Sequence, residues 1–247
     1  MTAGRRPGER HGPIGILGGT FDPVHMGHIA VAAAARQALG LEVVQLVPTR
    51  IPPHRTRQPF ASIYHRFAMA ALAALSGEGM QVSDLDCETP GPSYTSLLLD
   101  RLQNQGYRAS QIVFLTGADA FAEIATWHNY PAILDRCHFA VISRPGQQTV
   151  ELRARLPHLA ARFVPVTAGA VAGAGTTSVP IESRTPAVFL IDAATPDVSS
   201  TDIRERRRAG APIDGLVPAW VDQYIRRHAL YADSVSTAGH LHEHTAQ

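Results

Sequence analysis

Short runs of apolar residues alternate along the chain with longer segments in which apolar residues recur at helical spacing. The apolar runs predict strands at residues 14–17, 42–47, 81–84, 111–115, 138–143, 162–166 and 187–191. The segments with helical spacing predict helices at residues 29–39, 63–76, 94–105, 202–209 and 218–228. Because strands alternate with helices, we expect an α/β fold: a doubly wound, mostly parallel sheet with helices on both faces.

Residues with special backbone preferences mark several ends of these elements. Gly40 and Gly106 stand where a glycine ends a helix. Pro48 closes the second strand, and Ser93 is expected to cap the N-terminus of the helix over residues 94–105. These signals place the expected boundaries.

The chain divides into one long patterned region with two less regular ends. Residues 13–231 are expected to form a single domain, and the length would also allow two small ones. Residues 1–12 are basic and rich in glycine and proline, so we expect a flexible N-terminus. Residues 167–184 lack periodicity and predict a flexible insertion. Residues 232–247 predict a disordered tail, and their histidines leave a metal-binding tail as the alternative.

The most distinctive stretch runs from Gly18 to His28, between the first strand and the first helix. A turn of this kind directs backbone N–H groups and the positive end of a helix dipole at one point, which suits an anion. Gly18 and Gly19 lack Cβ atoms, so a phosphate can approach closely. His25 and His28 are three residues apart and share a helix face. A polyphosphate site is therefore expected, and a tight turn with two surface histidines is the alternative.

Composition excludes several classes of protein. The chain has 22 basic and 21 acidic residues, so its net charge of +1 indicates no nucleic-acid or membrane surface. No apolar run approaches the ~18 residues of a membrane span. The only cysteines, Cys87 and Cys137, are expected to be reduced thiols of a cytoplasmic protein. The chain contains no lysine, which excludes a Schiff base or a P-loop lysine.

A second motif lies far from the first, at Val198-Ser199-Ser200-Thr201-Asp202-Ile203-Arg204. Together the two motifs resemble the signatures of the nucleotidyltransferase superfamily with a His-x-Gly-His motif. Further segments resemble one branch, the bacterial nicotinate-nucleotide adenylyltransferases: Pro52-Pro53-His54-Arg55, Ser93-Tyr94-Thr95, Gly117-Ala118-Asp119, Trp127 and the stretch over residues 216–231. The resemblance covers residues 13–231 and implies a Rossmann-like nucleotidyltransferase fold.

The resemblance implies transfer of the adenylyl group of ATP to nicotinate mononucleotide, which gives deamido-NAD and pyrophosphate in NAD biosynthesis. It implies catalytic roles for His25, His28 and Arg204. The implied ATP-binding residues are Gly18, Gly19, Thr20, Phe21, Gly27, His28, Ser200, Thr201 and Arg204. The implied residues for the mononucleotide are His54, Arg55, Tyr94, Thr95, Asp119, Trp127 and Arg144.

Several of these residues also have a simpler, purely structural interpretation. Trp127 could be a core or rim aromatic residue, Asp119 a helix N-cap, and Arg204 a solvated helix residue. The family usually has lysine at the position of Arg55, which changes the geometry of that contact. The oligomeric state stays open.

Two other functions also stay open. One is adenylyl transfer to another acceptor, such as nicotinamide mononucleotide or phosphopantetheine. The other is a nucleotide-binding module without turnover. Mg²⁺ is expected with ATP, and because the sequence has no carboxylate cluster, the phosphates and water would hold it. Asp22 is expected to orient the turn rather than to bind metal.

Overall fold

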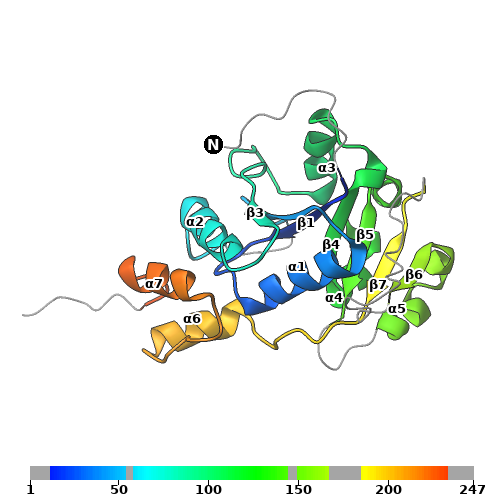
Figure 1. The fold of residues 1–247 in the computed structure, drawn as a ribbon. Coiled ribbons are helices and arrows are strands. Elements are labelled where there is room, and N and C mark those ends of the chain that lie inside the picture. The colour runs from blue at the N-terminus through cyan, green and yellow to red at the C-terminus, as the bar shows by residue number, and fades with distance from the viewer. Residues whose placement is uncertain (1–11, 54–57, 144–148, 167–184, 233–247) are drawn as a thin grey trace, which may run out of the picture.

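A single parallel sheet organises the protein, seen in a computed structural model that describes residues 12–53, 58–143, 149–166 and 185–232 (Figure 1). The sheet has seven strands in the order β3-β2-β1-β4-β5-β7-β6, and each neighbouring pair of strands is parallel. The strands are β1 (Ile14–Gly19), β2 (Val43–Pro48), β3 (Met80–Val82), β4 (Ile112–Gly117), β5 (His138–Ile142), β6 (Phe163–Val166) and β7 (Val188–Ile191). The α/β fold with a doubly wound parallel sheet is confirmed.

Helices cover both faces of this sheet. They are α1 (Met26–Leu39), α2 (Ile63–Ala74), α3 (Thr95–Asn104), α4 (Ala118–Ala122), α5 (Thr149–Arg155), α6 (Ser200–Arg208) and α7 (Ala219–Arg227). Short 3₁₀ helices lie at Ala109–Gln111, Ile124–Thr126, Ala132–Asp135 and Pro157–Arg162. None of the described helices has the length and apolarity needed to span a bilayer.

The core has two layers, one on each face of the sheet. Along β4, Val113 and Leu115 belong to the layer beneath α1, α2 and α7, whereas Ile112 and Phe114 belong to the layer beneath α3 and α4. This alternation follows from the two-residue period of a strand. It explains why the buried strands are continuous apolar runs in the sequence, since both of their faces are covered.

Most of the expected elements form close to their predicted ends. Gly40 ends α1 with a φ of 61°, and its N–H donates to the carbonyl of Arg36. The expected cap at Ser93 is wrong. Tyr94 is the N-cap of α3, and the hydroxyl of Ser93 instead accepts a hydrogen bond from the N–H of Ile51 at 3.0 Å. The short helices α4 and α5 were not expected, because too few residues form them for a periodic pattern.

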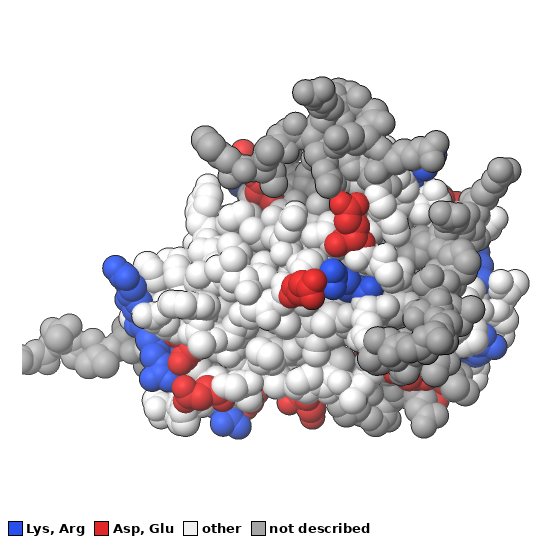
Figure 2. Space-filling model, in the orientation of Figure 1, with Lys and Arg blue, Asp and Glu red and all other residues white. Residues whose placement is uncertain are grey.

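Charged side chains are scattered over the face in Figure 2, where basic residues stand beside acidic ones. Along α6 and α7, Arg206 pairs with Asp202 and Arg226 pairs with Asp222, each four residues away on its helix. Such exposed pairs contribute only about 0.3–0.5 kcal/mol each.

The order of the strands fixes where a ligand can bind. The chain builds β1, β2 and β3 outward to one edge and then returns to place β4 on the other side of β1. Helices that follow β1 and β4 therefore leave toward opposite faces, and a crevice opens at the carboxyl ends of these two strands.

Candidate active site

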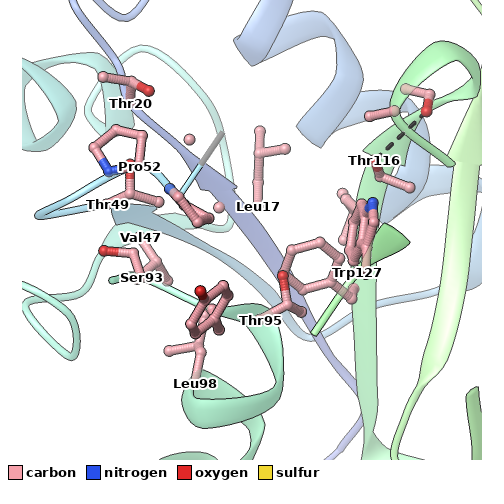
Figure 3. A pocket seen from close by; sticks show the side chains of 18 of the residues that line it. Leu17, Thr20, Val47, Thr49, Pro52, Ser93, Thr95, Leu98, Thr116 and Trp127 are labelled. Carbon is pink, nitrogen blue, oxygen red and sulfur yellow. Dashed lines mark hydrogen bonds between the residues drawn. The ribbon is translucent and has the colours of Figure 1, made fainter. Parts of the chain in front are cut away.

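A cavity of about 670 Å³ lies at the crevice between the carboxyl ends of β1 and β4 (Figure 3). One side is formed by the ends of β1 and β2, including Thr20 and Thr49, and the other by Thr116 and Trp127. The start of α3 closes a third side with Ser93, Tyr94 and Thr95. Segments that are far apart in the sequence thus face one space, whose size suits a small-molecule ligand.

Glycines at the end of β1 set the shape of the turn. Gly18 and Gly19 line the cavity. A Cβ on Gly19 would lie 2.8 Å from the ring of Phe21, so only glycine fits there. Phe21 is buried, has a φ of 50°, and meets the edge of the His28 ring at a centroid distance of 4.9 Å. Phe21 therefore packs against His28 and does not line the cavity.

The two histidines of the first motif lie against each other at the start of α1. Their ring centroids are 3.7 Å apart. His25 is the N-cap, and its backbone N–H donates to Nδ1 of His28 at 3.2 Å. His28 lines the cavity, whereas His25 is 7% exposed and does not. A Cβ on Gly27 would lie 3.0 Å from Nδ1 of His25, so Gly27 makes room for that ring.

Asp22 holds the middle of the turn from inside the protein. Its carboxylate is 1% exposed and accepts hydrogen bonds from the N–H groups of Phe60 at 2.8 Å and Ala61 at 3.0 Å. The hydroxyl of Tyr231 donates to the same carboxylate at 2.8 Å. Burial, followed by the charge of Asp22, raises the pKa of Tyr231 above its ordinary value of 10.0. Asp22 thus fixes the turn and does not line the cavity.

The second motif, residues 198–204, contacts the same turn. Arg204 is 7% exposed, donates from Nη1 to the carbonyl of Asp22 at 2.7 Å and from Nη2 to Oγ1 of Thr201 at 3.0 Å. The hydroxyl of Ser200 donates to the carbonyl of Pro23 at 2.9 Å. The guanidinium carbon of Arg204 also lies 4.8 Å from the ring centroid of Phe60. These contacts join α6 to the turn, although Ser200, Thr201 and Arg204 are not among the residues that line the cavity.

The opposite wall carries aromatic residues. Trp127 is half-buried and meets Phe114 edge to face, with ring centroids 5.9 Å apart. Tyr94 has an extended backbone before α3, so the first N–H groups of that helix, beginning at Thr95, have no partner within the helix. Both Tyr94 and Thr95 line the cavity.

The remaining expected residues do not join this cavity in the part of the chain that the structure describes. Asp119 is exposed on α4 and is not a lining residue, and Gly117 rather than Asp119 is the N-cap of that helix. His54, Arg55 and Arg144 lie outside the described residues, as do the insertion at 167–184 and the tail beyond residue 232.

Sequence reasoning missed two residues that organise the walls. Arg66 is 1% exposed and donates to the carbonyls of Thr20 at 2.7 Å and Thr49 at 2.6 Å, which ties the ends of β1 and β2 together. Asp86 is 3% exposed, lines the cavity and pairs with Arg101 at 3.0 Å. For Arg66 a signal existed, because position 66 is in phase with the buried face of α2.

Among the described residues, no group of three or more histidine, cysteine, aspartate or glutamate side chains could hold a metal ion. The arrangement offers instead imidazole groups, backbone N–H groups and hydroxyls around one space. These groups can bind phosphates and orient them.

Comparisons with known proteins identify relatives over most of the chain. The chain matches the cytidylyltransferase-like family over residues 16–206. It is 36% identical over 222 residues to a probable nicotinate-nucleotide adenylyltransferase of Moorella thermoacetica, which covers 90% of this chain and 93% of the relative. It is 37% identical over 219 residues to a protein of the same name from Roseiflexus sp., which covers 89% of this chain and 98% of the relative.

Solved structures show the same fold. The nicotinic acid mononucleotide adenylyltransferase of Plasmodium falciparum, complexed with NaAD, superposes with a TM-score of 0.64 at 17% identity. The superposition covers 90% of this chain and 98% of that one. A second structure of the Plasmodium falciparum enzyme, complexed with APC, gives a TM-score of 0.63 at 18% identity, with 90% and 98% of the two chains covered.

Proposed function

We infer the function from family membership: the chain belongs to the nicotinate-nucleotide adenylyltransferases within the cytidylyltransferase-like family. It transfers the adenylyl group of ATP to nicotinate mononucleotide, and the products are deamido-NAD and pyrophosphate. One observation supports this function most strongly. The histidine turn after β1 and the aromatic wall at Tyr94 and Trp127 face the same cavity, so two substrates can meet there.

We propose that ATP binds on the turn side of the cavity. Gly18, Gly19 and Thr20 let the phosphates approach the backbone, and the N-terminus of α1 favours their charge. His28 would donate to the phosphates from Nε2. The N–H of His25 occupies Nδ1 of His28, so the neutral ring carries its proton on Nε2.

Arg204 is proposed to act on the same phosphates while it holds α6 on the turn. Two of its N–H groups donate to Asp22 and Thr201, which fixes the plane of the guanidinium. Phosphates that bind at the start of α6 would also meet the backbone and hydroxyls of Ser200 and Thr201. This role is consistent with burial of the charged group beside the turn.

We propose that nicotinate mononucleotide binds against the aromatic wall. The indole of Trp127 offers a flat face for the pyridine ring, and the N–H groups at the start of α3, near Tyr94 and Thr95, suit its carboxylate. Asp119 for the ribose, and His54, Arg55 and Arg144 for the phosphate, remain predictions from the sequence.

The reaction then needs little acid–base chemistry. An oxygen of the mononucleotide phosphate forms a bond to the α-phosphorus of ATP, while the bond from that phosphorus to the bridging oxygen breaks and pyrophosphate leaves with the electron pair. The attacking phosphate is already largely ionised, with a second pKa of about 6. The protein therefore contributes position and fixed positive donors, which are the main sources of rate in phosphoryl and nucleotidyl transfer.

Mg²⁺ is proposed as the cofactor. No metal-binding cluster occurs among the described residues, so the ATP phosphates and water would supply most ligands. When bound, the ion neutralises phosphate charge. EDTA should abolish turnover, and added Mg²⁺ should restore it.

The direct test uses the purified protein with ATP, Mg²⁺ and one acceptor at a time. Deamido-NAD and pyrophosphate should form in equal amounts with nicotinate mononucleotide. Nicotinamide mononucleotide, phosphopantetheine and a reaction without acceptor are the controls. Pyrophosphate release that requires no acceptor, or turnover with phosphopantetheine alone, would contradict the proposal.

We also propose that residues 13–231 act as one nucleotidyltransferase domain. The described strands from Ile14 to Ile191 join one sheet, and buried side chains of α6 and α7 belong to the apolar cluster on one face of that sheet, which supports this organisation. A cytoplasmic location is the corresponding proposal for an enzyme of NAD biosynthesis.

A further inference from the structure

His128 directly follows Trp127 and also lines the cavity. Its ring is stacked on that of Tyr94, with centroids 4.4 Å apart and planes inclined by 18°. Trp127 and Tyr94 are the residues against which the proposed function places the pyridine ring and its carboxylate. His128 is exposed and lines the cavity, so a ligand can reach it.

A buried hydroxyl fixes the orientation of this ring. Nδ1 of His128 shares a hydrogen bond of 2.7 Å with Oγ of Ser96, the second residue of α3, which is 2% exposed. The ring is thus held by its face on Tyr94 and by one nitrogen on Ser96. Nε2, on the far side of the ring from Nδ1, is the nitrogen that remains for a ligand.

We propose that His128 is a specificity-determining residue that donates a hydrogen bond from Nε2 to the carboxylate of nicotinate. When the hydroxyl of Ser96 donates to Nδ1, the proton of the neutral imidazole stands on Nε2. A protonated ring also carries a proton there. The inference rests on the proposed function, because it takes the pyridine ring of the acceptor to lie at Trp127.

The acidic side chains that line the cavity make an N–H donor important for binding a carboxylate. Two acidic side chains, Asp86 and Glu123, also line the cavity, and each is paired with an arginine, Arg101 at 3.0 Å and Arg155 at 3.6 Å. Ionised carboxylates only accept hydrogen bonds, so they offer a substrate carboxylate no donor. A fixed N–H donor next to the aromatic wall supplies one. It favours an acid over an amide, because a hydrogen bond to a charged acceptor is stronger than one to a neutral acceptor.

The test compares two acceptors with wild type and three variants. His128→Phe keeps the stacking on Tyr94 and removes the donor. Ser96→Ala keeps the imidazole of His128 and removes the hydroxyl that is bonded to its Nδ1. His158→Phe is the matched control, since His158 is an exposed histidine that bonds Tyr130 at 3.0 Å and does not line the cavity. The measurements are kcat/KM and the equilibrium Kd for nicotinate mononucleotide and nicotinamide mononucleotide.

His128→Phe should lower kcat/KM for the acid about tenfold to a hundredfold, the range expected for one hydrogen bond to a charged group. Its effect on the amide should be small, so the acid-to-amide ratio falls. Ser96→Ala should shift the ratio the same way by less, and His158→Phe should leave it unchanged. The Kd values should follow the same pattern.

An unchanged acid-to-amide ratio of kcat/KM in folded His128→Phe would overturn the inference and leave the proposed function standing. This holds whether both kcat/KM values stay at the wild-type level or fall by the same factor. Equal losses would mean that His128 only supports Tyr94. Failure of the wild type to adenylylate nicotinate mononucleotide would instead contradict the proposed function, and this inference with it.

Discussion

The hydroxyl of Tyr231 donates to Oδ1 of Asp22 at 2.8 Å across 209 residues of sequence. The turn that follows α7 is therefore attached to the turn that carries the histidine motif. The same carboxylate accepts the N–H groups of Phe60 and Ala61. Two segments that are distant in the sequence thus hold the carboxylate of Asp22 and fix the position of the turn before any ligand arrives.

Tyr231→Phe should destabilise the protein by about 1.5–3 kcal/mol, the usual contribution of a hydrogen bond to a charged group. Part of the effect should appear as a higher KM for ATP, because Asp22 would hold the turn less firmly. Chemical denaturation and steady-state kinetics measure the two effects. Wild-type stability together with a wild-type KM would contradict this assignment.

The same pair predicts a pH dependence. The pKa of Tyr231 is raised in the folded protein, by burial first and then by the charge of Asp22. Above pH 10 the unfolded chain loses this proton while the folded protein keeps it, so stability falls by up to about 1.4 kcal/mol per pH unit. The difference in unfolding free energy between wild type and Tyr231→Phe should be constant below about pH 9 and shrink above pH 10. A constant difference up to pH 11 would be the contrary result.

Arg204→Lys should lower both stability and kcat/KM for ATP. A lysine ammonium cannot reproduce the planar fork that reaches the carbonyl of Asp22 and the hydroxyl of Thr201. We expect a loss of about 1–3 kcal/mol in unfolding free energy, because a buried carbonyl loses its partner. Arg208→Lys is the matched control, since Arg208 lies over the same Phe60 ring at 5.1 Å but is exposed. Equal behaviour of the two variants would mean that Arg204 is an ordinary helix residue.

His28→Ala should reduce kcat by about 10²–10³, the typical effect of removing one donor to transition-state charge. The physical reason is the Nδ1 contact with the N–H of His25, which sets Nε2 of His28 as a donor in advance. Single-turnover rates and a thermal melt separate lost chemistry from lost folding. His158→Ala serves as control. Normal turnover by folded His28→Ala would exclude the proposed phosphate role.

Both thiols should react slowly while the protein is folded. Burial, and then the neighbouring charges of Asp84 and Asp86, raise the pKa of Cys87 to about 11, and burial raises that of Cys137. The thiolate is the reactive form, so little of it is present near pH 8. Iodoacetamide labelling should accelerate at least about tenfold in denaturant. Rapid labelling of Cys87 in native protein at pH 8 would contradict the expected burial.

Local patterns in the sequence predict the sheet, the order of elements and the histidine turn, because buried parallel strands and a strand–turn–helix unit depend on neighbouring residues. The contacts of Arg204 could not be predicted in this way, since its partner Asp22 is 182 residues away. Ser93 shows the same limit. Its hydroxyl would suit a helix cap, but in the folded protein it accepts a hydrogen bond from the N–H of Ile51, which is distant in the sequence.

Asp119 illustrates a second limit of sequence patterns. Gly117 of the segment Gly117-Ala118-Asp119 lines the cavity, as does Thr116 before it, whereas Asp119 is exposed on α4 and does not line it. A strand end is predictable from its apolar run. The direction of a side chain on the short helix that follows depends on how that helix packs, which the pattern does not contain.

Trp127→Ala should weaken binding of both mononucleotides and leave the acid-to-amide ratio nearly unchanged. Trp127 meets Phe114 edge to face and lines the cavity, where we propose that a pyridine ring stacks on its indole. Stacking of a base on an aromatic side chain contributes about 1–3 kcal/mol, so KM should rise roughly tenfold for each acceptor.

The acid-to-amide ratio distinguishes the role of Trp127 from that of His128. Stacking depends on the ring and hardly on its substituent, whereas a fixed N–H donor responds to whether the substituent is an acid or an amide. Trp127→Ala and His128→Phe should therefore change different quantities, affinity in the first variant and preference in the second. A large change of preference in Trp127→Ala would show that the indole also positions the carboxylate, and the division of roles between the two adjacent residues would be wrong.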